Sequence, residues 1–343
     1  MKIHFVAIGG SAMHNLAISL KIKGYDVSGS DDEIFEPSKS RLKSYGILPE
    51  TIGWNSEKIT PDIDAIILGM HAREDNLELI KAKQLGLKIY SYPEFIYEQS
   101  KNKKRIVVGG SHGKTTITSM ILHVLNYYNI ACDYMVGAQL EGFDVMVKLT
   151  EQAPCIVIEG DEYLTSPLDP RPKFHLYKPD TGIISGIAWD HINVFPTFEN
   201  YIEQFRIFAK QISPNGTLIY CEDDENCRTI AKQTNCKHIW GYTVPDYVIE
   251  NHICKIIVEN KKIPLQVFGK HNLQNINAAR LACRSMNISD ENFYQAIQSF
   301  KGASKRLELV YENSTCCMYK DFAHAPSKLK ATIDAVKEKF RDR

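Results

Sequence analysis

The sequence predicts an α/β protein with two parallel-sheet units and the beginning of a third α/β unit. Short apolar runs alternate with segments of helical periodicity along most of the 343 residues. In addition, glycine-rich turns follow a strand and precede a helix at two places, residues 9–10 and residues 109–113. Because such alternation places helices on the faces of a parallel sheet, it favours a doubly wound architecture.

The first unit is expected in residues 1–100. An apolar strand at residues 3–8 stops at Gly9 and Gly10, and residues 12–23 then have helical spacing. The polar, basic stretch QSKNKKR at residues 99–105 interrupts the pattern as a linker or surface turn would, and we expect the domain boundary there. The further strands expected are residues 25–30, 64–68 and 88–90, and the helices are residues 38–45 and 76–85.

The second unit is expected in residues 101–302. A strand at residues 105–109 leads into the loop GSHGKTT and an apolar helix at residues 117–127. Further strands are expected at residues 155–158, 181–187, 216–221 and 238–240, and helices at residues 198–212 and 275–286.

The third unit, residues 303–343, has two predicted strands (residues 306–311 and 316–319), the segment DFAHAP and a final helix. Because so short a segment is below the usual size of an independent domain, we expect an incomplete C-terminal domain.

The composition excludes several classes of protein. Lys plus Arg and Asp plus Glu are balanced at 41 each, so no net field attracts nucleic acid or an anionic membrane. The nine cysteines form no C-x-x-C pair, which argues against a disulfide framework or zinc site. The opening MKIHFVAIGG fits a buried strand better than a signal peptide, and no apolar run has membrane-spanning length. We therefore expect a cytoplasmic protein with no nucleic-acid or membrane partner; the oligomeric state is not predicted.

The loop at residues 110–116 predicts binding of a nucleoside triphosphate, ATP with Mg²⁺. Backbone N–H groups at a helix N-terminus bind phosphate, Lys114 adds charge, and the Thr115 hydroxyl suits a magnesium ion. The strict P-loop pattern requires glycine where the chain has Val108, so the loop is a shortened variant. A fortuitous turn is the alternative, and the strand before and helix after disfavour it. The expected contacts in the loop are Gly110, Ser111, His112, Gly113, Lys114, Thr115 and Thr116.

The first glycine turn is weaker evidence for a ligand. Gly9, Gly10 and Ser11, with Asp31 after the second strand, approximate a dinucleotide fingerprint without meeting its G-x-G-x-x-G spacing. An oxidoreductase, a UDP-sugar site and simple helix–strand packing all remain open on these residues. The triphosphate loop disfavours the oxidoreductase, which has no need of it. Three side chains after the third strand, His71, Arg73 and Asn76, are further contacts expected for a diphosphate or sugar, although Arg73 could equally be a surface charge.

Two groups of polar residues follow apolar strands in the second unit. The segment CIVIEGDE ends in carboxylates that include Glu159, and WDH contains His191. Ligands gather beyond the carboxyl ends of parallel strands, so Glu159 and His191 are candidate magnesium ligands with Thr115.

Together these segments resemble the Mur ligase family, which joins an amino acid or peptide to UDP-N-acetylmuramic acid when peptidoglycan is made or recycled. The resemblance covers the whole chain and is carried by AIGGSAM, GSD, GSHGKTT, IEGDE, WDH, GKHNLQN, KRLE and DFAHAP. It implies a UDP-sugar domain, a central ATP domain and a C-terminal domain for the amino substrate. Within the family, the segment of residues 162–195 looks closer to the ligase that attaches the tripeptide L-alanyl-γ-D-glutamyl-meso-diaminopimelate in recycling. Its marks are Tyr163, Asp169, Arg171, Lys173 and Phe174, with KRLE at residues 305–308.

The L-alanine-adding ligase is the alternative within the family, and a nucleotide-binding module without turnover is another, because little chain follows DFAHAP. The sequence also departs from the family pattern at Gly186 and Ala188, where an asparagine and an acid are usual, and at Lys320, where an acid is common.

The resemblance implies that the muramyl carboxylate attacks the γ-phosphate of ATP and that an amine then displaces phosphate. Lys114, Glu159 and His191 would be the catalytic set, with His112 facing the sugar carboxylate. Arg306 would reach the γ-phosphate, while Asp321 and His324 would line the nucleotide. His271, Asn272 and Asn275 would contact adenine, or could instead be helix-capping groups.

Overall fold

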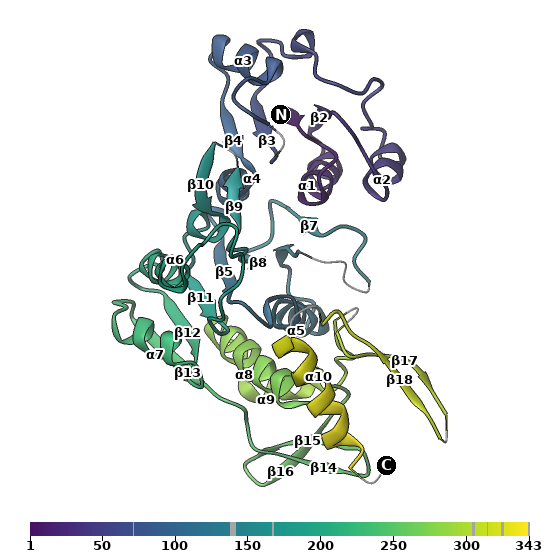
Figure 1. Cartoon of the computed structure of the whole chain (residues 1–343), viewed down its shortest axis with the longest axis vertical. Coiled ribbons are helices and arrows are strands. Elements are labelled where there is room, and N and C mark those ends of the chain that lie inside the picture. Colours follow the sequence, from purple (N-terminus) through teal and green to yellow (C-terminus); the bar gives the residue numbers. More distant parts are fainter. Residues whose placement is uncertain are drawn as a thin grey trace.

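The computed structural model describes residues 1–70, 72–137, 142–166, 168–303, 306–313, 315–323 and 326–341, without the side chain of Ser327. Its first unit is a four-stranded parallel sheet of order β2-β1-β3-β4, at the top of Figure 1. The strands are β1 (Lys2–Val6), β2 (Asp26–Ser30), β3 (Ala65–Leu68) and β4 (Ile89–Ser91). The helices are α1 (Ser11–Ile22), α2 (Ser38–Ser44), α3 (Leu77–Gln84) and α4 (Tyr92–Ser100), with the short 3-10 helix η1 (Ser56–Lys58).

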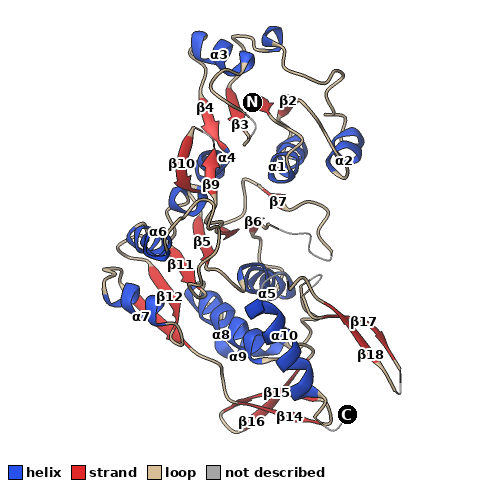
Figure 2. Cartoon of the chain, in the orientation of Figure 1, coloured by secondary structure: helices blue, strands red, loops and turns tan. Residues whose placement is uncertain are grey.

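A larger sheet of order β13-β12-β11-β5-β8-β6-β7 forms the middle of the molecule. Its strands are parallel except for β7, which is antiparallel to β6. The strands are β5 (Lys104–Gly109), β6 (Asp133–Met135), β7 (Val147–Lys148), β8 (Cys155–Glu159), β11 (Thr181–Ile184), β12 (Thr217–Cys221) and β13 (His238–Tyr242). The helices are α5 (Lys114–Tyr127), α6 (Phe198–Lys210), α7 (Glu225–Lys232), α8 (Lys270–Ser285) and α9 (Asp290–Ile297), and Figure 2 shows them beside the strands.

Smaller elements complete the described fold. A two-stranded pair, β9 (Leu164–Ser166) and β10 (Asp169–Pro172), precedes the 3-10 helix η2 (Lys173–Leu176). An antiparallel sheet contains β14 (Tyr247–Glu250), β15 (Ile253–Val258) and β16 (Lys261–Leu265). The hairpin of β17 (Glu308–Glu312) and β18 (Cys317–Lys320) is followed by α10 (Pro326–Lys339), which packs against α8.

The central sheet is buried on both faces, which explains its nearly continuous apolar strands. Along β5, Ile106 and Val108 belong to the core beneath α5 and α8, whereas Val107 points to the opposite core with Phe174 and Phe208. The mixed α/β fold with parallel sheets is thus confirmed.

Some boundaries differ from the prediction. The stretch predicted as a linker or surface turn at residues 99–105 is a shorter turn at residues 101–103, because α4 continues to Ser100 and β5 begins at Lys104. The hydrogen bonds between Ser91 and Glu94 form a capping box that starts α4. Helix α8 begins five residues earlier than predicted, at Lys270 rather than residue 275, so GKHNLQN is the first part of a helix.

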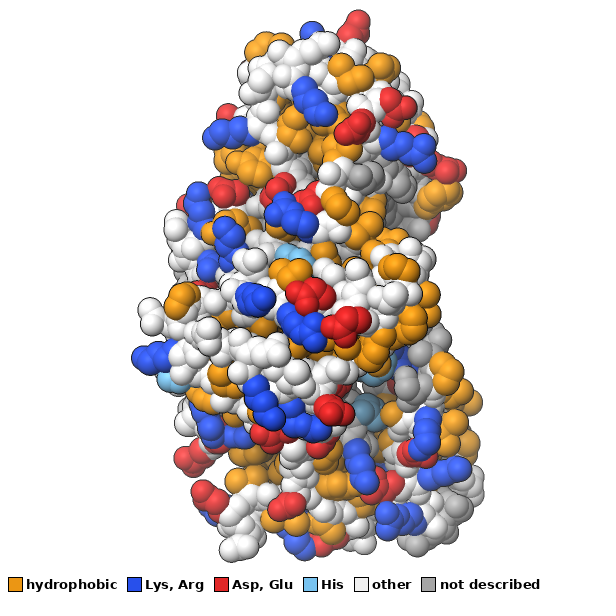
Figure 3. All heavy atoms as spheres, turned by 60° about the vertical axis from the view of Figure 1, so that its left-hand side comes forward, with side chains coloured by type: hydrophobic (Ala, Val, Ile, Leu, Met, Phe, Trp, Pro, Cys, Tyr) orange, Lys and Arg blue, Asp and Glu red, His pale blue; other side chains and the backbone are white. Residues whose placement is uncertain are grey.

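The surface carries mixed charge. Over the described residues of the face in Figure 3, Lys and Arg side chains are interspersed with Asp and Glu. Within the described ranges, no helix combines the length and the apolar character needed to cross a membrane.

Candidate functional site

The phosphate loop connects the end of β5 to the first residue of α5. Gly110 and Gly113 have φ values of 125° and 81°, a region that side chains with a β-carbon rarely adopt. A β-carbon on Gly113 would also collide with the side-chain amide of Asn275 on α8. The loop therefore requires glycine both for its turn and for its close approach to α8.

Lys114 is held inside this loop by a carboxylate that the sequence did not assign. Its Nζ donates to Oε2 and Oε1 of Glu162 at 2.7 and 2.8 Å, and to the carbonyl oxygen of Gly110 at 2.7 Å. The buried Glu162 also accepts from the backbone N–H of Gly110 at 3.1 Å. Burial lowers the pKa of Lys114, but the adjacent Glu162 carboxylate outweighs this effect and raises it overall. Lys114 is thus a positioned ammonium group facing the ligand side of the loop.

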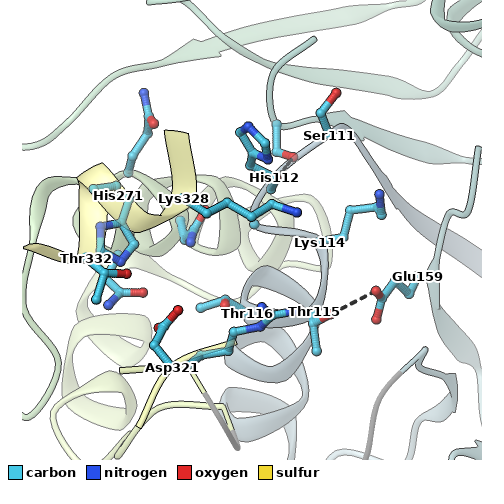
Figure 4. A pocket seen from close by; sticks show the side chains of 17 residues that line it. Ser111, His112, Lys114, Thr115, Thr116, Glu159, His271, Asp321, Lys328 and Thr332 are labelled. Atoms are coloured by element: carbon cyan, nitrogen blue, oxygen red, sulfur yellow. Dashed lines mark hydrogen bonds between the residues drawn. The ribbon is translucent and has the colours of Figure 1, made fainter. Parts of the chain in front are cut away.

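Thr115 and Glu159 provide oxygen ligands side by side. The Thr115 hydroxyl donates to Oε1 of Glu159 at 2.8 Å, drawn as a dashed line in Figure 4. The other carboxylate oxygen of Glu159 accepts from the N–H of Gly137 at 3.0 Å. A hydroxyl and a carboxylate next to a phosphate loop are a donor set that fits Mg²⁺.

His191 lies in a second group of possible metal ligands. One ligand atom each from Asp161, Glu162 and His191 lies within 4.8 Å of the others. The His191 ring meets the ring of Tyr163 edge-on with centroids 5.4 Å apart, and Asp161 pairs with Lys173 at 2.6 Å. The structure therefore places His191 with Asp161 and Glu162, and Thr115 with Glu159.

A pocket of about 300 Å³ brings most of the predicted ATP residues together. Its walls come from the phosphate loop, α5, α8, the segment after residue 305 and α10. Gly110 lies in the loop without lining the pocket, and His324 lies outside the described residues. The predicted residues that line it are Ser111, His112, Gly113, Lys114, Thr115, Thr116, Glu159, His271, Asn272, Asn275, Arg306 and Asp321.

Sequence reasoning missed five lining residues, Ser185, Gln274, Lys328, Ala331 and Thr332. Gln274 lies within GKHNLQN but was not singled out there, and the other four lie outside the motifs named above.

Two of the predicted ATP contacts, Asn272 and Asp321, also form hydrogen bonds within the protein. The buried Asn272 side chain donates to the carbonyl oxygen of Phe268 at 2.9 Å, next to the start of α8. Asp321 accepts from the backbone N–H of Leu307 at 2.7 Å. Burial lowers the pKa of His271, although the nearby Asp321 carboxylate opposes this effect.

The N-terminal glycine turn is stabilised by Asp31. The buried carboxylate accepts from the N–H of Gly9 at 2.6 Å, so it shapes the turn itself. Gly10 caps α1, and Ser11, its first residue, lines a pocket of about 330 Å³ together with Lys114 and Glu159. The N-terminus of α1 therefore opens toward the phosphate loop.

Two further predicted sugar-nucleotide residues, Arg73 and Asn76, line a different cavity. Asn76 caps α3 by accepting from the N–H groups of Glu78 and Leu79 at 3.0 and 3.1 Å. With Arg73 it lines a separate cavity of about 500 Å³ beside Asp32. His71 lies outside the described residues.

Known proteins are similar to this chain along its whole length. Residues 2–104 match the Mur ligase family, catalytic domain, and residues 108–283 match the Mur ligase middle domain. UDP-N-acetylmuramate–L-alanine ligase from Carboxydothermus hydrogenoformans is 32% identical over 355 residues, covering 100% of this chain and 74% of the relative. The Clostridium kluyveri enzyme of the same name is 33% identical over 350 residues, covering 98% and 74%.

Among solved structures, a murein peptide ligase from Psychrobacter arcticus has a TM-score of 0.78 at 26% identity, covering 100% of this chain and 77% of that chain. These similarities favour a ligase over the oxidoreductase considered for the first glycine turn. The chain belongs to the Mur ligase family, and it is an ATP-dependent ligase of peptidoglycan synthesis that forms carbon–nitrogen bonds.

Proposed function

We propose that this chain joins the carboxylate of UDP-N-acetylmuramic acid to L-alanine at the expense of ATP. The observation that carries the proposal is the 32–33% identity, along essentially the whole chain, to ligases named for that reaction. It favours L-alanine over the tripeptide that the sequence segment at residues 162–195 suggested.

The geometry supports a two-ligand reaction between the first and second units. ATP would occupy the pocket of GSHGKTT, and the sugar nucleotide would lie at the N-terminus of α1. The shared pocket of Ser11, Lys114 and Glu159 would bring the muramyl carboxylate next to the γ-phosphate. Such alignment supplies most of the catalysis in phosphoryl transfer.

In the proposed reaction, a carboxylate oxygen attacks the γ-phosphorus and ADP leaves. The amine nitrogen then attacks the acyl carbon, phosphate leaves with that oxygen, and the nitrogen loses a proton. Lys114 and Arg306 would stabilise the charge on the phosphoryl group. Thr115 and Glu159 would hold one Mg²⁺, with His191 and Asp161 at a second, and the ions would neutralise phosphate charge.

The test is a substrate panel with purified protein, UDP-N-acetylmuramic acid and either L-alanine or the tripeptide. ADP release should require the sugar nucleotide and L-alanine together, and Lys114→Met should abolish it. ADP release that is independent of the sugar nucleotide would contradict the proposal.

The tripeptide remains the second candidate because the Psychrobacter arcticus structure is named a murein peptide ligase. In this chain, Arg171 pairs with Asp169 at 2.7 Å and Lys173 pairs with Asp161 at 2.6 Å, which orders the segment that resembles the recycling branch. A preference for the tripeptide in the panel would establish this second function instead.

A further inference from the structure

Helix α10 brings a lysine from the C-terminal segment to the phosphate side of the ATP pocket. The helix packs across the start of α8, where Ala335 is buried against Gly269. Lys328 lies near the N-terminal end of α10 and lines the same pocket as the phosphate loop. Figure 4 shows its side chain extending from the helix into the pocket, toward the side where Lys114 and His112 lie.

The charges around this pocket come from separate parts of the chain. Lys114 belongs to the loop, Arg306 precedes β17, and Lys328 belongs to α10. The acids that line the same pocket are Glu159 and Asp321. Glu159 accepts a hydrogen bond from the Thr115 hydroxyl, and Asp321 accepts one from the backbone N–H of Leu307. Both carboxylates are therefore hydrogen-bonded to residues of the protein.

We infer that Lys328 contacts the terminal phosphate of the nucleotide bound at GSHGKTT, opposite Lys114. The inference rests on the proposed placement of ATP in this pocket. A triphosphate carries its greatest charge density at the γ-phosphate, and cations on two sides of it would bind that group more tightly than the loop alone. The contact would also couple ATP binding to the docking of α10 on α8.

The electrostatic environment of Lys328 agrees with an anionic ligand. Burial lowers its pKa, and although Asp190 opposes this, Lys114 and Arg306 lower it further. A phosphate placed among these three cations would reduce their mutual repulsion.

Loss of the Lys328 contact should weaken the binding of ATP and not that of ADP, because only ATP has the γ-phosphate. Lys328→Met in the full chain should weaken binding of a non-hydrolysable ATP analogue about tenfold and change ADP binding by less than about twofold. Lys328→Arg keeps the charge and should retain most of the preference for the triphosphate. Lys330→Met is the matched control, because Lys330 lies on the same helix, is exposed and pairs with Asp334 at 2.7 Å; neither affinity should change.

Titration calorimetry with Mg²⁺ measures these affinities, and thermal unfolding verifies that each variant folds. Equal losses for ATP analogue and ADP, or no loss for either, would overturn the role of Lys328. If Lys114→Met weakens nucleotide binding while Lys328→Met does not, only the Lys328 inference fails. If Lys114→Met leaves nucleotide binding unchanged, the proposed ATP site fails as well.

Discussion

Nζ of Lys114 lies 2.7 Å from Oε2 of Glu162, and Glu162 also accepts the Gly110 N–H of the same loop. The carboxylate therefore neutralises the loop lysine and ties it to the backbone of its own loop. A bound phosphate would offer Lys114 a second anionic partner.

Glu162→Gln should destabilise the ligand-free protein. The change leaves the ammonium of Lys114 without its counter-ion, at a cost of about 3–5 kcal/mol. A non-hydrolysable ATP analogue should then raise the melting temperature of the variant more than that of the wild type, because phosphate replaces the lost charge. Glu203→Gln, which removes a partly exposed ion pair with Arg206, is the control and should cost less than about 1 kcal/mol. Unaltered stability of Glu162→Gln would refute the counter-ion role.

Gly113→Ala should destabilise the protein more than Gly24→Ala, a substitution at another glycine with a positive φ. The alanine would have to adopt a φ of 81° and displace Asn275. Gly24 also has a positive φ, 90°, but a β-carbon added there would meet no atom within 4 Å. Gly24→Ala therefore tests backbone strain alone, and it should lower the free energy of unfolding by about 1 kcal/mol. Urea unfolding should show the larger loss for Gly113→Ala, and ATP binding should be lost only there. Equal effects of the two substitutions would show that contact with Asn275 is unimportant.

Thr115→Val should raise the Mg²⁺ concentration needed for half-maximal ADP release by about tenfold, since the variant lacks the hydroxyl beside Glu159. Thr115→Ser retains the hydroxyl and should behave like the wild type. The rate of ADP release, measured at increasing Mg²⁺ concentration, gives this value for both variants. If Thr115→Val needs no more Mg²⁺ than the wild type, Thr115 is not a ligand of the ion.

Glu78→Gln should lower the stability of the first unit in a pH-dependent way. Burial raises the pKa of Glu78, but hydrogen bonds from His4, the Asn55 backbone and Ser30 outweigh it and lower the pKa below 4.5. The ionised carboxylate therefore stabilises the fold fully above pH 4.5, and this contribution is lost as the pH falls through the lowered folded-state pKa. The variant should be about 1–3 kcal/mol less stable than wild type near pH 7, and the difference should shrink toward pH 3. A difference in denaturant stability that is constant with pH would contradict this account.

The sequence was most informative where structure is local. Strand, glycine turn and helix follow one another around GSHGKTT, so the loop and the role proposed for Lys114 needed no knowledge of distant contacts. Glu159 could be associated with Thr115 because ligands gather beyond the carboxyl ends of parallel strands. The structure adds that β5 and β8 are neighbours in the sheet.

Residues that act through tertiary packing could not be found in this way. Glu162 was visible in IEGDE, but only the fold brings it to Lys114, 48 residues away in sequence. Lys328 lies in a helix whose docking on α8 no local pattern encodes. The capping box of Ser91 and Glu94 was a local signal for α4 that the basic segment after it obscured.

The central claim, activation of a carboxylate by ATP, is tested most directly with UDP-N-acetylmuramic acid labelled with ¹⁸O in its carboxylate. During ligation to L-alanine or the tripeptide, the account predicts that each released phosphate carries one labelled oxygen, because that oxygen bridges carbon and phosphorus in the acyl phosphate. Mass spectrometry of the phosphate measures this. Unlabelled phosphate released during amide formation would contradict the mechanism.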